Sequence, residues 1–340
     1  MATCFRCKQS ISGNVIRAVN KDWHPECFVC YGCGGPIQAA RFSLFSGRPY
    51  HADCFLCEGC GKPIGNKRFL LGENKPYHEA CYHRKFTPGC SVCDKPLIGK
   101  FSIDIWGNRF CIKHNKKLVP CTSCQRLISD GLTRGGKKYK DGTPICNLCL
   151  PHAVTSQAEA LKIFDETRKG FEALGFRFKG AETPFRLVDA KEIKRFKKVK
   201  RNKPILGMAR NQVTTQGKKV VRRDFQEIIV LAGLPRLHFE TVCVHELCHA
   251  WLFFNGFYGL PQKTEEGLCT LSEFLWLKQF DSDEAKVRRR MINENQDPIY
   301  GNGFREAAKA LEKRDLAQVL TYVRKNGRFP GTGLLGRLFG

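Results

Sequence analysis

The cysteines of this 340-residue chain form a repeating pattern that limits what its first 150 residues can fold into. Sixteen of the nineteen cysteines precede residue 150, and every one of them belongs to a pair of cysteine or histidine residues separated by two positions. The pairs combine into five sets, with 16 to 21 residues between the two pairs of a set. The sets are Cys4, Cys7, His24, Cys27; Cys30, Cys33, His51, Cys54; Cys57, Cys60, His78, Cys81; Cys90, Cys93, Cys111, His114; and Cys121, Cys124, Cys146, Cys149.

Each set has the ligands of one tetrahedral structural zinc site. A Cys-x2-Cys turn places two sulfur atoms on one Zn²⁺, and the residues between the pairs form a short hairpin that returns the second pair. Such knuckles have little core of their own, so zinc binding supplies much of their folding energy. All four positions are filled by protein and leave no vacancy for water, which argues against catalysis at these five sites.

Composition limits the location and the partners. The sequence has no signal peptide and no apolar run near the roughly 20 residues that span a bilayer, so we expect a soluble, cytoplasmic protein without membrane contact. The formal charge of +25 falls to about +21 when thiolates and zinc are counted. Its excess lies largely in two stretches, 191–203 and 218–223, interpreted as solvated loops or strand edges. A nucleic-acid partner is therefore disfavoured.

A separate domain begins after Cys149, where apolar periodicity replaces the cysteine pattern. A capping box at Ser156 predicts a helix that ends near Gly175, with Leu161, Phe164 and Phe171 facing inward. Strands are predicted over 185–188, 205–215 and 225–231. The last of these is predicted to be an edge strand along which a substrate could lie extended.

A predicted helix over 238–255 carries the sequence His-Glu-Leu-Cys-His. His245 and His249, four residues apart, project from one helix face and can share a metal, while Glu246 lies beside the metal-bound water. A third ligand is expected from Glu265 or Glu266 in the first turn of a following helix. The glycine after them, Gly267, would let these two helices approach closely.

Other polar residues are weaker candidates. Tyr300 follows Pro298 in a glycine-rich turn and is either a donor to the oxyanion of a transition state or a packed loop residue. His83 and His238 are interpreted as a spectator and a helix-start residue. The three remaining cysteines are interpreted as small core residues. They are Cys243, Cys248 and Cys269.

The first two sets resemble a LIM domain. They abut, and Trp23-His24 with Cys27-Phe28 completes the pattern over residues 4–54. A RING finger is the nearest rival, but it interleaves its sites. The unit over 57–114 is LIM-like, and the fifth set is a half-LIM knuckle. The resulting domains are 1–55, 56–116, 117–152 and 153–340. LIM domains are protein-binding units, so we expect protein partners here; a spacer or an inhibitory lid is the alternative.

The last domain resembles the gluzincin metallopeptidases at His245 to His249 and Glu266-Gly267. With LIM modules in front, it is similar to the LIM-domain peptidases of plants, which are ubiquitin-activated regulators of organ growth. Further matching stretches are 233–237, 265–269 and 300–305. The resemblance implies a zinc endopeptidase with His245, His249 and Glu266 as ligands and Glu246 as general base. The plant proteins carry ubiquitin-interacting helices before the LIM region, whereas this chain starts at that region, so activation by ubiquitin is not expected to carry over.

Together these observations predict an α+β protein with tandem zinc knuckles followed by a gluzincin-like domain that has a small sheet and an active-site helix. It would bind one catalytic and five structural Zn²⁺ ions and hydrolyse protein substrates. The alternative is an adaptor whose metal-bound domain has no turnover. Glu246 argues against the adaptor, because a scaffold needs the metal ligands but not a general base.

Overall fold

The computed structural model describes residues 2–38, 41–65, 67–140, 142–195, 205–217 and 219–331. The chain divides into two compact units, Met1–Ser102 with Arg109–Ile112, and Ile103–Asn108 with Lys113–Gly340. This division does not test the four predicted domains, which stay predictions. Parts of the two basic stretches, 196–204 and Lys218, lie outside the described residues. Among the helices that the structure describes, none is long and apolar enough to cross a membrane.

Small hairpins accompany the ligand sets along the chain, which confirms the prediction from their spacing. In the first hairpin Val19 and Asn20 have φ of 59° and 56°, the two-residue turn that matches the twist of paired strands. The described part of the chain has five two-stranded sheets: β1 (Ile16–Ala18) with β2 (Lys21–Trp23), β3 (Ser43–Phe45) with β4 (Arg48–Tyr50), β5 (Phe69–Gly72) with β6 (Lys75–His78), β7 (Phe101–Ile103) with β8 (Arg109–Cys111), and β9 (Gly136–Lys138) with β10 (Pro144–Cys146). Short helices accompany these hairpins: α1 (Glu79–Phe86), α2 (His114–Lys117) and α3 (Asp130–Thr133) lie between them, and η1 (Leu150–His152) follows β10.

The second unit contains one three-stranded sheet. Its strands are β11 (Phe185–Val188), β12 (Gly207–Gln216) and β13 (Lys219–Leu231), in the order β11-β13-β12. β13 pairs with β11 in parallel and with β12 antiparallel. The prediction that 225–231 is an edge strand is therefore wrong for its second half, because 228–231 pair with β11 while 228–230 also pair with β12. β13 also begins six residues earlier than predicted, since its hairpin with β12 continues beyond the buried core.

The described helices of the second unit from residue 157 onward are α4 (Gln157–Ala173), α5 (Ala190–Arg195), α6 (Arg236–Phe254), α7 (Gln262–Leu277), α8 (Asp283–Asn293), α9 (Tyr300–Glu312) and α10 (Leu316–Asn326). Helices α4, α5 and α6 pack on the sheet, whereas α7 packs on α6, and α8 and α9 pack on α7. Ser156 caps α4 by accepting a hydrogen bond from Glu159 N, as predicted. Phe164 and Phe171 are buried, but Leu161 is 43% exposed. The inward prediction for Leu161 is wrong, because the buried face of α4 contains Ile163 beside Phe164.

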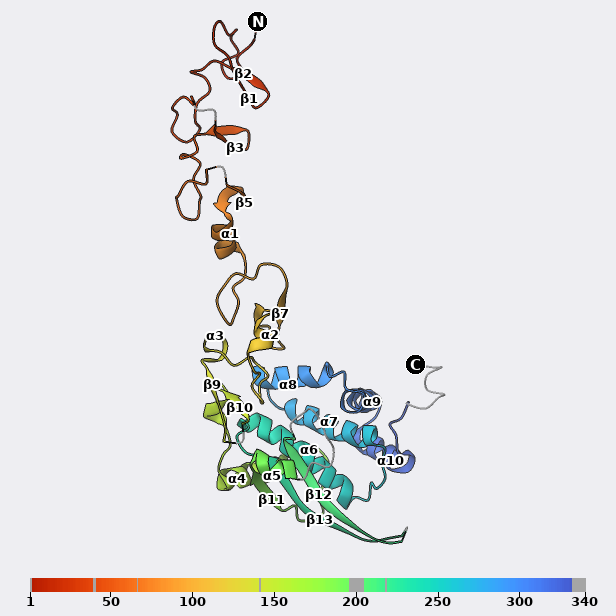
Figure 1. The fold of residues 1–340 in the computed structure, drawn as a ribbon. Helices are drawn as coiled ribbons and strands as arrows, with labels where there is room; N and C mark the ends of the chain where they lie inside the picture. The colour runs from red at the N-terminus through yellow and green to blue at the C-terminus, as the bar shows by residue number, and fades with distance from the viewer. Residues whose placement is uncertain are drawn as a thin grey trace. The chain divides into compact units, whose positions relative to one another are not determined.

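Helix α6 is central to the unit. Figure 1 shows β12 and β13 running alongside α6, and α4 and α7 also pack on it. Most of its residues are buried, as expected for a helix that is apolar on all sides. Gly233, with φ of 90°, turns the chain into the helix, and Pro235 stands at its N-cap. A buried helix that is packed on several sides holds its polar side chains in fixed positions.

Candidate active site and metal centres

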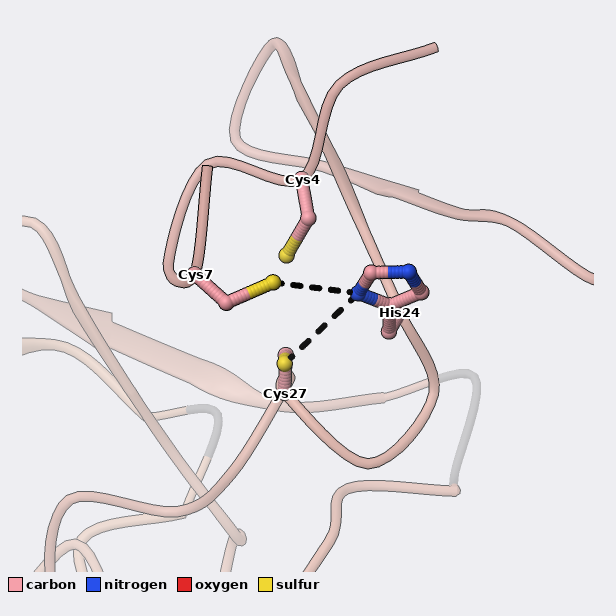
Figure 2. A group of neighbouring side chains, drawn as sticks. All are labelled: Cys4, Cys7, His24 and Cys27. Carbon is pink, nitrogen blue, oxygen red and sulfur yellow. Dashed lines mark hydrogen bonds between the residues drawn. The ribbon is translucent and has the colours of Figure 1, made fainter. Parts of the chain in front are cut away.

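The first three groups of zinc-type ligands share one geometry, which Figure 2 shows for Cys4, Cys7, His24 and Cys27. The Nδ1 atom of His24 lies 3.3 Å from Cys7 Sγ and 3.8 Å from Cys27 Sγ. The corresponding distances are 3.3 and 3.7 Å in the second group and 3.4 Å in the third. A tetrahedral zinc ion with bonds of about 2.3 Å to sulfur and about 2.0 Å to nitrogen sets these atoms about 3.5 Å apart. The residues therefore fit zinc.

Backbone groups hold these ligands in the form that zinc requires. His24 Nε2 lies 3.3 Å from Ser10 O, and the equivalent distances in the next two groups are 3.2 and 3.1 Å. The backbone N–H groups of Gly32 and His51 donate to Cys30 Sγ. Burial raises the pKa of the Cys30 thiol, but such backbone donors lower it to about 6. Fixed imidazole tautomers and stabilised thiolates are both features of structural zinc sites.

Two further groups bring four ligand atoms within 4.8 Å of one another. They are Cys90, Cys93, Cys111, His114 and Cys121, Cys124, Cys146, Cys149. The second of them is fully buried, and its Cys124 and Cys146 Sγ atoms are 3.6 Å apart, close to the roughly 3.8 Å expected for two sulfurs on one tetrahedral zinc. His83 belongs to none of these groups. It lies in α1, and its Nδ1 is 2.9 Å from Oγ1 of Thr87, the residue just after that helix.

The two histidines of α6 converge on one carboxylate oxygen from α7. Glu266 Oε2 lies 3.2 Å from His245 Nε2 and 3.6 Å from His249 Nε2. This oxygen is buried and, within the described residues, has no hydrogen-bond partner. Ligands on a tetrahedral zinc with bonds of about 2.0 Å lie about 3.3 Å apart. A buried acceptor without a donor, at this distance from two imidazole nitrogens, fits a metal ion.

Two other carboxylates of α7 hold the opposite side of each ring. Glu273 Oε1 lies 2.5 Å from His245 Nδ1, and Glu265 Oε1 lies 2.9 Å from His249 Nδ1. Each imidazole then presents Nε2 to Glu266, because a carboxylate at Nδ1 fixes the tautomer with a proton on that atom. The two glutamates between which the sequence left a choice thus have different contacts. Glu273 was missed, and its only sequence signal is its place seven residues beyond Glu266 on the same helix.

The electrostatics of this cluster favour the charged forms of both the two histidines and Glu266. Burial lowers the pKa of His245, but Glu266 and Glu273 raise it well above its usual value. Burial likewise lowers the pKa of His249, while Glu265 and Glu266 raise it to about 10. Burial raises the pKa of Glu266, yet the two histidines hold it well below the usual range. A metal ion that binds these residues therefore has to displace protons from the imidazoles.

Glu246 lies next to the start of β12. It is 7% exposed, and its Oε2 accepts a hydrogen bond of 2.7 Å from Ala209 N. A side chain at Gly207 would come within 2.8 Å of Glu246 Cγ, so only glycine leaves room for the carboxylate there. Burial raises the pKa of Glu246, and the charges of His245 and His249 oppose that shift. The sequence indicated neither contact from β12.

Tyr300 reaches the cluster from α9. Its hydroxyl donates to Glu266 Oε1 over 3.2 Å. The residue is the first of a helix and not part of the predicted glycine-rich turn. Gly267 brings its helix close to α9 and not, as predicted, to α6: a side chain on it would come within 2.6 Å of the Gly303 backbone. The glycine pair therefore sets the approach of α7 and α9 that brings Tyr300 to Glu266.

The remaining candidates lie in the core. Cys243, Cys248 and Cys269 are fully buried. His238 lies in the first turn of α6, and its Nδ1 is 2.9 Å from Ser123 Oγ. Burial, and next the charge of Arg288, hold the pKa of His238 well below its usual value.

Two family models match parts of the chain. Residues 186–291 match the model described as Protein DA1, and residues 4–48 and 30–86 match the LIM domain. The first range includes α6 and α7 with their histidines and glutamates. The fourth and fifth ligand groups lie outside both matches.

Several relatives match nearly the whole chain. Protein DA1 of Arabidopsis thaliana is 25% identical over 390 residues, which cover 96% of this chain and 68% of that protein. Protein DA1-related 1 of the same plant is 25% identical, with 96% and 66% covered. LIM domain-containing protein HDR3 of Oryza sativa subsp. japonica is 26% identical, with 96% and 74% covered. This chain spans about two thirds of the length of the Arabidopsis relatives. It therefore carries LIM domains followed by a DA1-like domain and is homologous to the DA1 proteins of Arabidopsis.

Proposed function

We propose that this chain is a zinc-dependent endopeptidase in which His245, His249 and Glu266 hold the catalytic ion and Glu246 is the general base. The observation that carries this proposal is the convergence of two Nε2 atoms on Glu266 Oε2, a buried oxygen that lies within ion-pair distance of both histidines but has no hydrogen bond within the described residues. A purely structural cluster would satisfy that oxygen with a donor. The two carboxylates behind the histidines support the same function, since metal-binding imidazoles commonly have such partners.

The protein groups divide the proton transfers between them. Zinc, when bound, lowers the pKa of a water molecule and polarises a carbonyl group. Ala209 N–H holds Oε2 of Glu246, so Oε1 is the atom that takes the proton from water and returns it to the leaving amine. The Tyr300 hydroxyl donates to Glu266 Oε1, and in the proposed reaction it would leave that oxygen and donate its proton in a hydrogen bond to the oxyanion that forms on the scissile carbonyl.

An extended peptide would lie along β12, which replaces the edge predicted on β13. Within the described residues β12 has a neighbouring strand on one side only. Its first residues also contact Glu246 through Ala209 N and Gly207. A peptide paired with this edge through main-chain hydrogen bonds would thus pass directly beside the general base.

The ligand groups before residue 150 complete the proposal as five structural zinc sites. The LIM modules among them would dock protein substrates or partners, or hold the peptidase inactive. LIM domains commonly mediate protein interactions, which supports docking. We also retain a cytoplasmic location as part of the proposal.

The test uses the full chain and its Glu246→Gln variant, which keeps the size of the side chain but cannot act as a base. Both are incubated with a peptide library, and new termini are identified by mass spectrometry. We expect cleavage by the wild type and a loss of about a hundredfold or more in the variant, with the zinc count unchanged by native mass spectrometry. A wild type that carries all its zinc but cleaves nothing would favour the adaptor.

A further inference from the structure

The fifth group, Cys121, Cys124, Cys146 and Cys149, differs from the others in its surroundings. In each of the first three groups one cysteine is exposed and two ligands are only partly buried, whereas all four cysteines of the fifth group are buried. A knuckle of this size cannot bury four ligands by itself. Its hydrophobic cover comes from Trp106 and from Ile128, Tyr139 and Leu150 of the knuckle, and polar contacts join this covered knuckle to the DA1-like domain.

Ser123, between the first two ligands of the fifth group, makes the first contact with that domain. It is 2% exposed, and its Oγ lies 2.9 Å from His238 Nδ1 and 3.1 Å from Arg288 Nη2. The guanidinium donates to the hydroxyl, and the hydroxyl donates to the neutral imidazole. His238 belongs to α6 and Arg288 to α8. In the other four Cys-x2-Cys turns the equivalent residue has no hydroxyl: Arg6, Gly32, Gly59 and Val92.

The hairpin of the knuckle, and the segment that follows the knuckle directly, make a second, independent contact. Tyr139 donates from its hydroxyl to Gly233 O over 3.2 Å, and a side chain at Gly233 would come within 2.5 Å of the Tyr139 ring. Val154 forms two backbone hydrogen bonds with the residues just before α6. Its N–H donates to Leu234 O, and its carbonyl accepts from Gly233 N–H. The knuckle and the residue two positions after it thus contact both the entry to α6 and its first turn.

These contacts lead directly to the candidate active site. His238 precedes His245 by seven residues, which is two helical turns and about 10.5 Å along α6. Arg288 lies on α8, which packs on α7, the helix that carries Glu266. The same knuckle is therefore attached to the helix of the two histidines and to the support of the third ligand.

We propose that the fifth group is an integral zinc site of the DA1-like domain and that Ser123 is a positioning residue, which sets α6 and α8 through His238 and Arg288. When zinc leaves this group, the first turn of α6 loses its anchor and the site of His245, His249 and Glu266 loses its geometry. The proposal rests on the proposed function only where it concerns activity. Its zinc-retention and exchange predictions hold whether or not the chain is a peptidase.

The first experiment follows the full wild-type chain through a chelator time course. Native mass spectrometry counts the zinc, cysteine alkylation identifies the ligands that have been freed, and hydrogen exchange reports on the amides of 236–245. We expect the cysteines of the first three groups to be alkylated while these amides stay protected. Protection is then lost together with alkylation of Cys121, Cys124, Cys146 and Cys149. Alkylation of the fifth group while α6 stays protected would overturn the proposal.

The second experiment compares Ser123→Ala with Arg6→Ala, a matched change at the same turn position in the first group. In Ser123→Ala we expect the 236–245 amides to exchange about tenfold faster or more, because a buried hydrogen-bond chain is broken, and the fifth zinc to leave faster. Ser123→Thr, which keeps the hydroxyl, should restore much of the protection, and Arg6→Ala should match the wild type. Exchange in Ser123→Ala that equals the wild type would refute the role of Ser123, even if peptide cleavage is never detected.

Discussion

Replacing Glu273 by glutamine should weaken zinc binding at His245 without touching a proposed ligand. The carboxylate lies 2.5 Å from His245 Nδ1 and, through that nitrogen, keeps Nε2 directed at Glu266. Glutamine has nearly the same size and can still accept a hydrogen bond, so the change removes mainly the charge. It therefore isolates the electrostatic support that a second carboxylate gives to a metal-binding imidazole.

The structure also predicts that Glu273→Gln lowers zinc affinity more than Glu265→Gln, the equivalent change behind the other histidine. Losing such a partner typically costs about 10-fold to 100-fold in metal affinity, which is about 1.4 to 2.7 kcal/mol. The Glu273 side chain is 20% exposed, and that of Glu265, behind His249, is 40% exposed. Solvent screens the more exposed pair more strongly. We therefore expect Glu273→Gln near the upper end of this range and Glu265→Gln near the lower end.

The assay is a chelator competition on the full chain at constant pH, read by native mass spectrometry as the ratio of fully loaded protein to protein that lacks one zinc. Cysteine alkylation in the same samples must stay negative, which assigns the lost ion to the site without cysteine. Equal affinity in Glu273→Gln and the wild type would refute the reasoning. So would a larger loss in Glu265→Gln than in Glu273→Gln.

Two further predictions concern packing and pH. In Gly303→Ala the new methyl would come within 2.4 Å of Lys263 O, a backbone atom that cannot move cheaply, so we expect a loss of about 1 to 3 kcal/mol in unfolding free energy and displacement of Tyr300. Urea unfolding measures the first effect, and unchanged stability would contradict the close approach of α7 and α9. The buried His238 has a lowered pKa, so only the unfolded chain binds its proton as pH falls below about 6.5. As pH falls below that value, the free energy of unfolding of the wild type should decrease more steeply than that of His238→Gln, by up to about 1.4 kcal/mol per pH unit. Urea unfolding at several pH values measures both slopes, and equal slopes for the two proteins would exclude this contribution.

The features that the sequence predicted depend on residues close together in the chain. A Cys-x2-Cys turn, a short hairpin and two histidines four residues apart are each fixed by local backbone geometry. β11 was predicted with its observed bounds, and the capped start of α4 was also predicted correctly. Glu266 needed more, because the residues alone left it equal to Glu265, and the resemblance decided between them.

The features that the sequence did not predict depend on pairing between distant segments. Nothing in residues 225–231 shows that β11 pairs with the second side of 228–231, so this part of β13 was wrongly expected at an edge. The contact of Ala209 N with Glu246 requires the register of β12 over α6. The burial of Ser123 by His238, 115 residues later, is of the same kind. The prediction for Leu161 was wrong for a different reason. The apolar residues of α4 spread over more of its surface than one face can bury, and packing buried Ile163 and Phe164 and left Leu161 exposed.

The three glutamates of α7 show how much of the site follows once the direction of two helices is known. Seven residues join α6 to α7, and His249, near the end of α6, contacts Glu265, near the start of α7, whereas the earlier His245 contacts the later Glu273. This order requires the helices to be antiparallel. Glu265 and Glu273 are about 12 Å apart along their helix, twice the spacing of the two histidines along α6. Each glutamate therefore lies on the side of its imidazole that faces away from the other histidine. Glu266 then falls between them, and it is the only one of the three that can face both Nε2 atoms. The chemistry of the site thus depends on the separation of the outer pair as much as on the central ligand.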